Sequence, residues 1–483
     1  MRISKVYLVG AGPGDAKLMT IKGLEAIQKA DVILYDRLVN PSLLDFSSSS
    51  CEKIYCGKLP DRHHLKQDEI NKLLVEKALE GKTVVRLKGG DPGVFGRVGE
   101  EAEELANHEI PFEIIPGITS GIAAPLYAGI PVTHREYGES FAIVTAHDKS
   151  NDGEGKINWE GLAKGIDTIA FYMGIANLQT ICEKLIHYGK SENTPVILIQ
   201  WGTYGRQKTV EGTLSSITTN AKKAQLTNPA ITLVGNIISL RSKLKWFENK
   251  PLFGRQILLA RTGILSSELA TDLINQGSDV IEFPKWKKST LTVDEVILQK
   301  IGDYEHILFT SPECVEDFFE ALFQSGRDIR EITGAIFGAS VKSVNALRKK
   351  GLNAELTGES SLSSGKLLTV KCEHRMGVQE RLERELEGDV YITSTIQLDK
   401  DYLPIYERMF QEASIDSVIF PSSKSVSCFI AGLKENLYNH QEFLQNKKVF
   451  CMGDKTRDAL QANGISDTVI SKQATRSSLL DSL

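Results

Sequence analysis

The 483-residue sequence lacks several features that would each assign it to a class of protein. No apolar run approaches the ~18 residues that a membrane-spanning helix needs, and the first ten residues lack the apolar core of a signal peptide. The seven cysteines form no CxxC pair and the nine histidines form no HExxH or HxxxH motif, so we expect no metal site. An odd number of cysteines without paired spacing is typical of reduced thiols, so we expect a cytoplasmic protein that is not bound to a membrane.

Basic charge is also scarce, because 57 Lys plus Arg stand against 62 Asp plus Glu, a formal net charge of −5. Domains that bind nucleic acid are usually strongly basic, so we expect no nucleic-acid partner. The mild acidity leaves anionic ligands open, since a local basic pocket can lie within an acidic protein. Hydrophobic residues are 41% and charged residues 25% of the chain, as in ordinary globular proteins, and the length predicts roughly three to four folding units.

Short apolar runs alternate with helix-like stretches along the first half of the chain. The strand-like runs are VYLVG, DVILYD, TVVRLKGG and FEIIPG, and after Arg135 they continue with FAIVTAH, DTIAFYMG, TPVILIQWG and PAITLVGNII. This alternation is typical of α/β proteins and predicts layers built on parallel strands. A stop signal at Asn249–Pro251, followed by the new strand-like run GRQILLAR, places a domain boundary near 247–253.

The second half contains a weak internal repeat. Residues 306–322 resemble residues 417–433, and residues 334–352 resemble residues 448–465. Each segment reads as a strand, a turn rich in polar residues and a helix. Two copies of one βαβα unit predict a half built from two lobes.

The motif GAGPGD, at residues 10–15, lies between a predicted strand and a predicted helix. Together with Asp36, 22 residues after Gly14, it mimics a dinucleotide-binding fingerprint in which such an acid binds ribose. The glycine spacing is GxGxG instead of GxGxxG, and Pro13 removes an amide donor from the loop. From this motif alone, a nicotinamide oxidoreductase and a purely structural tight turn both remain open.

Three further segments combine small residues with polar ones. RLKGGDPGVFGRVGEE (86–101) has four glycines between 89 and 96, at the end of a predicted strand where open α/β sheets bind ligands. PGITSGIAAPLYAGIPVTHR (116–135) ends in a His and an Arg that could meet carboxylates. FYMGIANL (171–178) holds Met173, which either lines an apolar pocket or fills the core.

In order and spacing, these motifs together resemble the tetrapyrrole methylase family, and in particular the uroporphyrinogen-III C-methyltransferases. The segments VYLVGAGPGD, LKGGDPGVFGR, IPFEIIPGITS, YAGIPVTHR, QWGTYGRQ, VEGTL and NPAITLVGNII contribute to the match. The resemblance implies two α/β subdomains, about 1–117 and 118–246, with S-adenosylmethionine between them. It also implies a homodimer formed through this half, and double C-methylation of uroporphyrinogen III to precorrin-2.

The resemblance assigns roles to individual residues. It implies Asp36 as proton acceptor and Lys58 as proton donor, although an ion pair of Asp36 with Arg37, and a substrate contact for Lys58, are alternatives. Carboxylates of the substrate would meet Arg37, His134 and Arg135. The cofactor contacts that it implies are Pro13, Gly89, Gly90, Asp91, Val94, Thr119, Ser120, Met173, Gly202 and Ala230.

After a linker at 247–252, residues 253–483 resemble uroporphyrinogen-III synthase through LLARTG, ILFTSPECVEDFF, CMGDKTRDAL and ATRSSLL. The resemblance implies two α/β lobes, about 253–285 plus 395–483 and 286–394, with the site between them. There hydroxymethylbilane would be closed into uroporphyrinogen III. The residues implied for that site are Arg261, Thr310, Ser311, Ser422 and Thr456, and the hydroxyls among them could equally be helix N-caps.

Two alternatives to a bifunctional enzyme stay open. Ser340, Ser343 and Pro421 stand where the synthase family usually has Gly, Thr and Thr, so the second half could be an inactive scaffold attached to an active methyltransferase. The less favoured alternative is the nicotinamide oxidoreductase suggested by GAGPGD.

Overall fold

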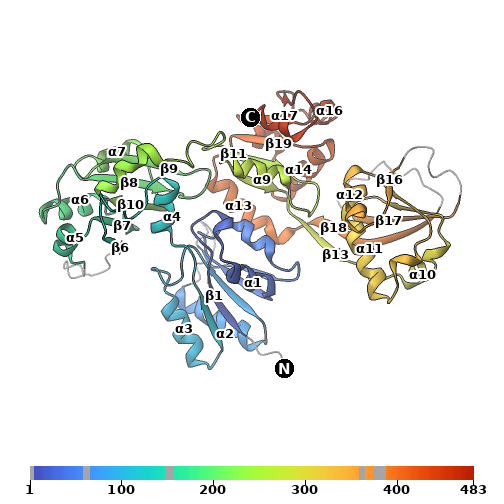
Figure 1. The fold of residues 1–483 in the computed structure, drawn as a ribbon, viewed down its shortest axis with the longest axis horizontal. Helices are drawn as coiled ribbons and strands as arrows, with labels where there is room; N and C mark the ends of the chain where they lie inside the picture. The colour runs from blue at the N-terminus through green and yellow to red at the C-terminus, as the bar shows by residue number, and fades with distance from the viewer. Residues whose placement is uncertain (1–4, 58–65, 147–156, 358–364, 375–387) are drawn as a thin grey trace.

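The computed structural model describes residues 5–57, 66–146, 157–357, 365–374 and 388–483. The strands of these residues form four sheets, two in the first half of the chain and two in the second. Figure 1 shows each sheet, with its own helices, as a separate body around a central region that contains α13 (Leu403–Glu412). No helix in these ranges is long and apolar enough to cross a membrane.

The first sheet has the strand order β3-β2-β4-β1-β5, and all its pairs are parallel. Its strands are β1 Val6–Gly10, β2 Val32–Tyr35, β3 Glu52–Tyr55, β4 Val84–Lys88 and β5 Phe112–Ile115. Its helices are η1 Ala16–Leu18, α1 Ile21–Lys29, η2 Pro41–Phe46, α2 Gln67–Leu79 and α3 Val98–Asn107. Because parallel strands end at the same edge, the loops after β1, β2 and β4 lie side by side there.

The second sheet has the order β6-β7-β10-β8-β9, and of these pairs only β6 with β7 is parallel. Its strands are β6 Phe141–Thr145, β7 Thr168–Tyr172, β8 Pro195–Gln200, β9 Lys208–Thr213 and β10 Ala230–Val234. Its helices are α4 Ser120–Tyr127, α5 Trp159–Gly165, α6 Leu178–His187, α7 Ile217–Lys223, η3 Asn236–Leu240 and α8 Arg241–Leu244. The prediction of parallel layers is therefore wrong for this sheet. A connection as short as 201–207, between β8 and β9, has no room for the crossover helix that parallel strands need.

The third sheet has the order β12-β11-β19-β20-β21, and its pairs are parallel. Its strands are β11 Gln256–Ala260, β12 Asp279–Phe283, β19 Ser417–Phe420, β20 Lys448–Cys451 and β21 Val469–Ile470. The helices beside it are α9 Glu268–Asn275, η6 Lys400–Tyr402, α13, α14 Ser423–Glu435, α15 His440–Leu444, α16 Asp454–Ala462 and α17 Arg476–Leu480. Strand β11, at the beginning of the second half of the chain, thus pairs with β19, near its end.

The fourth sheet has the order β13-β18-β17-β14-β15-β16. Its strands are β13 Trp286–Thr290, β14 His306–Phe309, β15 Ala335–Gly338, β16 Ala354–Leu356, β17 Leu367–His374 and β18 Asp389–Leu398. Its helices are α10 Glu295–Gln299, η4 Ile301–Asp303, α11 Pro312–Gln324, η5 Ile329–Glu331 and α12 Val341–Lys349. The antiparallel pair β13 and β18 joins this lobe to the third sheet, as Figure 1 shows.

The two halves of the chain share a hydrophobic core. One cluster joins Tyr35 and Leu43 of the first half to Phe283 and Tyr402 of the second. The Tyr402 hydroxyl donates to Asp45, whose other carboxylate oxygen lies 2.6 Å from Nζ of Lys285. Apolar burial is the main stabilising contribution to such contacts, so the residues after β2 are held against α13.

Candidate active sites

Three glycine-rich loops meet at the carboxyl edge of the first sheet. Gly12 and Gly90 exchange backbone hydrogen bonds of 3.1 and 2.7 Å. The Asp91 carboxylate accepts from the amides of Gly93 (2.7 Å) and Gly117 (2.9 Å). A Cβ added to Gly10 would lie 2.6 Å from the Gly117 nitrogen, so this close approach of backbones requires glycine.

A second wall faces these loops from the start of α4 and the ends of β7 and β8. The hydroxyls of Thr119 and Tyr172 are 2.5 Å apart, and the Asp15 amide donates to Thr203 across the junction at 2.9 Å. Met173 has a φ of 54° and is 46% exposed. The other predicted cofactor residues of this wall, Ser120, Gly202 and Ala230, lie in or beside the same elements.

The surface at this junction is partly open and apolar. A Cβ on Gly90 would meet nothing closer than 3.9 Å, so the backbone there is open to a neighbour. The side chains of Phe95 and Met173 are 43% and 46% exposed, although residues of this size are usually buried. Open backbone beside exposed apolar surface suits a ligand with an apolar ring and a polar chain.

Asp36 follows β2 and belongs to a buried network of charges. Its carboxylate lies 2.5 Å from Nη2 of Arg86 and 3.9 Å from Nζ of Lys88. Glu101 accepts from both bases, at 3.0 and 2.8 Å. Burial lowers the pKa of Arg86, but the charges of Asp36 and Glu101 raise it by more, so the guanidinium stays protonated. The sequence-based alternative of an Asp36–Arg37 pair is wrong.

Arg86, Lys88 and Glu101 belong to this site although no motif in the sequence assigned them to it. They are 2%, 4% and 0% exposed, and fully buried charges are rare unless they are paired. A signal was present in VVRLK, where two basic residues two positions apart interrupt an otherwise apolar strand. Side chains two apart point to the same face of a strand, which predicts a buried acidic partner.

The three residues predicted to bind substrate carboxylates are not brought together. Arg37 pairs with Glu412 of α13, with 2.8 Å between Nε and Oε1. His134 lies in a turn closed on Gly138, where its Nδ1 accepts from the Glu136 amide at 3.1 Å. Arg135, its neighbour, is exposed. Lys58, the predicted proton donor, lies outside the described residues.

In the second half, four of the predicted residues directly follow strands or begin helices, and Thr456 lies in the first turn of α16. Ser311 and Ser422 are the N-caps of α11 and α14, accepting from the amides of Cys314 (3.4 Å) and Ser425 (3.3 Å). The hydroxyl of Thr310 donates to the Val370 carbonyl, and that of Thr456 to the Met452 carbonyl. The N-cap interpretation therefore describes the two serines and does not describe the two threonines.

Arg261 follows β11, beside the crossing to the other lobe. Its Nε lies 2.8 Å from Glu282, and its carbonyl accepts from the indole of Trp286 at 3.3 Å. The second half also holds a buried polar cluster that the sequence analysis missed. Asp317, 6% exposed, accepts from Ser394 at 2.7 Å and pairs with Lys288 at 2.5 Å.

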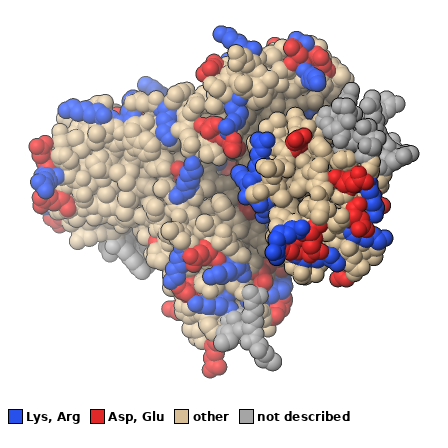
Figure 2. Space-filling model, turned by 45° about the vertical axis from the view of Figure 1, so that its right-hand side comes forward, with Lys and Arg blue, Asp and Glu red and all other residues tan. Residues whose placement is uncertain are grey.

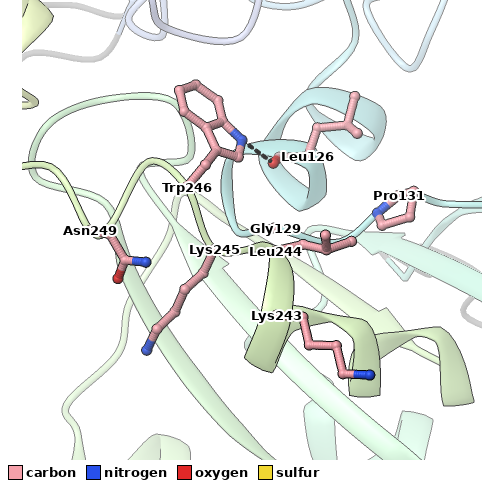
Figure 3. Close-up of a pocket in the computed structure, with 8 residues that line it drawn as sticks. All are labelled: Leu126, Gly129, Pro131, Lys243, Leu244, Lys245, Trp246 and Asn249. Atoms are coloured by element: carbon pink, nitrogen blue, oxygen red, sulfur yellow. Dashed lines mark hydrogen bonds between the residues drawn. The ribbon is translucent and has the colours of Figure 1, made fainter.

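A further pocket of about 460 Å³ lies between α4 and α8. Figure 3 shows Trp246 and Leu126 at its wall, where the indole donates to the Leu126 carbonyl at 3.1 Å, with Lys243 and Lys245 beside them. None of the site residues predicted from the sequence lines it. In Figure 2 basic and acidic side chains are mixed over the visible face, so surface charge does not single out a site either.

The fold and the first site define a class: an α/β protein of two subdomains, one with a parallel and one with a mainly antiparallel sheet, whose loops meet at one junction. The family model described as "Tetrapyrrole (Corrin/Porphyrin) Methylases" matches residues 5–218, and that of "Uroporphyrinogen-III synthase HemD" matches residues 267–481. The chain belongs to the tetrapyrrole methylase family, as a methyltransferase that carries a uroporphyrinogen-III synthase segment in its second half.

Relatives match across both halves. A uroporphyrinogen-III C-methyltransferase of Bacillus subtilis (strain 168) is 48% identical over 454 residues, which cover 94% of this chain and 92% of the relative. A porphyrin biosynthesis protein HemD of Ruminiclostridium josui is 34% identical over 499 residues, covering 99% and 97%. A uroporphyrin-III C-methyltransferase structure from Thermus thermophilus, complexed with S-adenosylhomocysteine, is 35% identical, covers 49% of this chain and 100% of that one, and has a TM-score of 0.42.

Proposed function

We propose that the first half transfers two methyl groups from S-adenosylmethionine to carbon atoms of uroporphyrinogen III, which gives precorrin-2. The observation that carries this proposal is the Asp36 carboxylate, held by the buried Arg86 at the edge of the sheet where the glycine-rich loops meet. Membership of the tetrapyrrole methylase family and the names of the relatives support the choice of substrate.

The residues of the cleft fit the cofactor. The backbone at Gly90 is open. The other residues that the resemblance implies as cofactor contacts lie around the same junction: Pro13, Gly89, Asp91, Val94, Thr119, Ser120, Met173, Gly202 and Ala230. When bound there, S-adenosylmethionine supplies an electrophilic methyl group on a sulfonium. The protein then has to align the attacking pyrrole carbon and exclude water, which is mainly positioning.

Asp36 accepts the proton that the ring cation must lose after the pyrrole carbon has been methylated. A positioned carboxylate is a competent base for this step, and Arg86 fixes its orientation from the buried side. Arg37, the next residue, is placed to bind a substrate carboxylate if Glu412 releases it. Lys58, His134 and Arg135 remain proposals as proton donor and carboxylate contacts.

The second half, on our proposal, closes hydroxymethylbilane into uroporphyrinogen III, so that it makes the substrate of the first half. The match of the synthase family to residues 267–481 supports this. The carboxylates and pyrroles of the linear substrate would be bound from both lobes by Arg261, Thr310, Ser311, Ser422 and Thr456. We place the boundaries of the two halves at 1–246 and 253–483.

We also propose a cytoplasmic homodimer formed through the first half. Ile118, Ile122 and Leu126 follow each other at intervals of four residues and are 37%, 37% and 45% exposed. Ile122 and Leu126 belong to α4, and Ile118 lies two residues before its first residue. Leu126 also lines the pocket of Figure 3. An exposed apolar stripe of this kind is typical of a subunit interface.

One reaction tests the proposal. Purified protein receives hydroxymethylbilane and S-adenosylmethionine, and the products are separated by chromatography. Precorrin-2 is expected, and appearance of only the uncatalysed type-I ring would show that the second half is an inactive scaffold. Uroporphyrinogen III supplied directly tests the first half alone. Calorimetric titration with S-adenosylhomocysteine, with NAD as the matched control, tests the cofactor.

A further inference from the structure

A cavity of about 520 Å³ lies between the two halves of the chain. Its walls come from residues 37–46 and 201–206 of the first half, and from residues 261–266 and α13 of the second. Figure 1 shows α13 in the region where the first sheet, the second sheet and the third sheet approach each other. The volume is within the range of about 300–1,000 Å³ that is usual for small-molecule sites.

Arg408 of α13 is the unusual residue of this cavity. It is 6% exposed, and its Nε and Nη1 are buried and have no hydrogen-bond partner among the described residues. Its Cζ lies 5.2 Å from the ring centroid of Tyr55. A buried guanidinium with unsatisfied donors is costly, and its planar fork fits a carboxylate. Two donors of Arg408 are therefore suited to a carboxylate, and no described residue supplies an acceptor for them.

The other charges of the cavity favour the same ligand. Seven basic side chains line it against five acidic ones. Four of the acids are already paired, Glu412 with Arg37, Glu282 with Arg261, Asp279 with Arg206 and Asp45 with Lys285. The fifth, Asp15, accepts from the hydroxyl of Tyr127. Excess positive charge in a hollow wall attracts anions.

Aromatic surface accompanies this charge. Three of the four tryptophans of the chain, Trp201, Trp246 and Trp286, line the cavity. The Arg206 guanidinium lies 4.0 Å from the ring centroid of Trp201, which keeps that ring in a fixed orientation. Flat apolar rings beside cationic groups suit a ligand that has pyrrole rings and peripheral carboxylates.

The cavity also reaches both proposed sites. Arg37, which follows the proposed base Asp36, lies on its wall, and so does Arg261, which belongs to the proposed synthase site. We propose that this cavity binds a polycarboxylated tetrapyrrole between the two sites, with one carboxylate held by Arg408. The inference rests on the proposed function. It adds a binding site that is made by both halves, and the product of the second half passes through this site to the first half.

Titration of the full-length protein with uroporphyrin III, a stable oxidised analogue of the proposed intermediate, tests this site. Quenching of tryptophan emission reports binding, because three tryptophans line the cavity. We expect Arg408→Gln to weaken the cavity-associated binding about tenfold, as expected for loss of a charge-assisted contact, and Arg408→Lys to have an intermediate effect. The matched control is Arg330→Gln, because Arg330 is 87% exposed and pairs only with Asp328 among the described residues.

Stability separates binding from a structural role. If Arg408 only holds the two halves together, Arg408→Gln unfolds at a lower urea concentration than wild type, and Arg408→Lys restores the wild-type midpoint. This pair of results would overturn the inference. If Arg408 is a ligand donor, the midpoint of Arg408→Gln is unchanged or higher, since an unpaired buried charge is removed. Equal affinity of wild type and Arg408→Gln for uroporphyrin III would also overturn it. Failure of the wild type to methylate uroporphyrinogen III would instead contradict the proposed function.

Discussion

The two halves of the chain build their candidate sites in different ways. In the first half, Asp36 is fixed by a network of charges, in which Arg86, Lys88 and Glu101 are all less than 5% exposed. In the second half, Ser311 and Ser422 offer hydroxyls at helix N-caps, and the lobes that carry them are joined by β13 and β18.

This difference follows from the chemistry that each half is proposed to perform. Removing a proton from the methylated ring cation requires a base that is held in position, and the buried guanidinium of Arg86 holds the Asp36 carboxylate. Closing a flexible linear molecule requires contacts from two lobes, which neutral hydroxyls and main-chain amides can make. We expect the loss of any one member to destabilise the whole charged network, whereas the loss of one N-cap affects only the helix that begins there.

The largest expected effect is on the proposed base. Asp36→Asn keeps the volume and removes the basic oxygen, so we expect methylation of uroporphyrinogen III to fall about 10²–10⁴-fold. Binding of S-adenosylhomocysteine, measured by calorimetry, is expected to persist. The closure of hydroxymethylbilane by the same variant is the internal control. Methylation at the wild-type rate would remove Asp36 from the mechanism.

The charged network predicts a difference in stability between the halves. Glu101→Ala leaves Arg86 and Lys88 buried with less compensation, so we expect a loss of about 3–5 kcal/mol in the free energy of unfolding. Glu100→Ala, at the exposed neighbouring position, is the control. Asp317→Ala in the second half should cost less, because the side chain of its partner Lys288 is 28% exposed. If urea unfolding shows equal losses in the free energy of unfolding for Glu101→Ala and Asp317→Ala, the expected difference between the halves is wrong.

The caps of the second half predict a smaller effect. Ser311→Ala and Ser422→Ala each remove an N-cap acceptor, and we expect each to cost about 1 kcal/mol in the free energy of unfolding. Replacement of either serine by Asp, which also caps helices, should restore most of the lost free energy of unfolding. If either alanine variant abolishes closure of hydroxymethylbilane while its stability falls only this far, that serine contacts the substrate as well.

The smallest effect is a pH dependence in the first half. Hydrogen bonds from Lys22 and Lys5 lower the pKa of Glu113 to about 2 from the ordinary value of 4.5. The stabilisation is therefore present above pH 4.5 and is lost as the pH falls toward 2. Unfolding of wild type and Glu113→Gln should differ at pH 6 and converge at low pH. A difference that stays constant down to pH 2 would contradict this.

Much of the first half could be predicted from sequence because most of its strands are short runs of mainly apolar residues. The run VVRLK is fully buried as β4, and the glycine motifs lie at the ends of β1 and β4. The parallel pairing predicted for the second sheet was wrong, because the alternation of runs does not specify strand direction. That direction follows from short connections, such as the one between β8 and β9.

The site was predicted less completely than the fold. Asp36 and the glycine loops were found through motifs, but its partner Arg86 lies 50 positions further along the chain. Arg37, which the sequence offered as an alternative partner of Asp36, pairs with Glu412, 375 positions away. Residues so distant in sequence meet only when strands are ordered into a sheet and the two halves are packed together.

The sequence by itself determined the two families of the chain, the alternation of strands and helices, and the glycine-rich ends of β1 and β4, because these depend on local spacing and backbone freedom. Only the tertiary structure decided which charges are paired, and that Arg37, Arg261 and Arg408 line one cavity. The physical reason is that pairing and burial of charge depend on distances across the folded molecule, which local sequence does not encode.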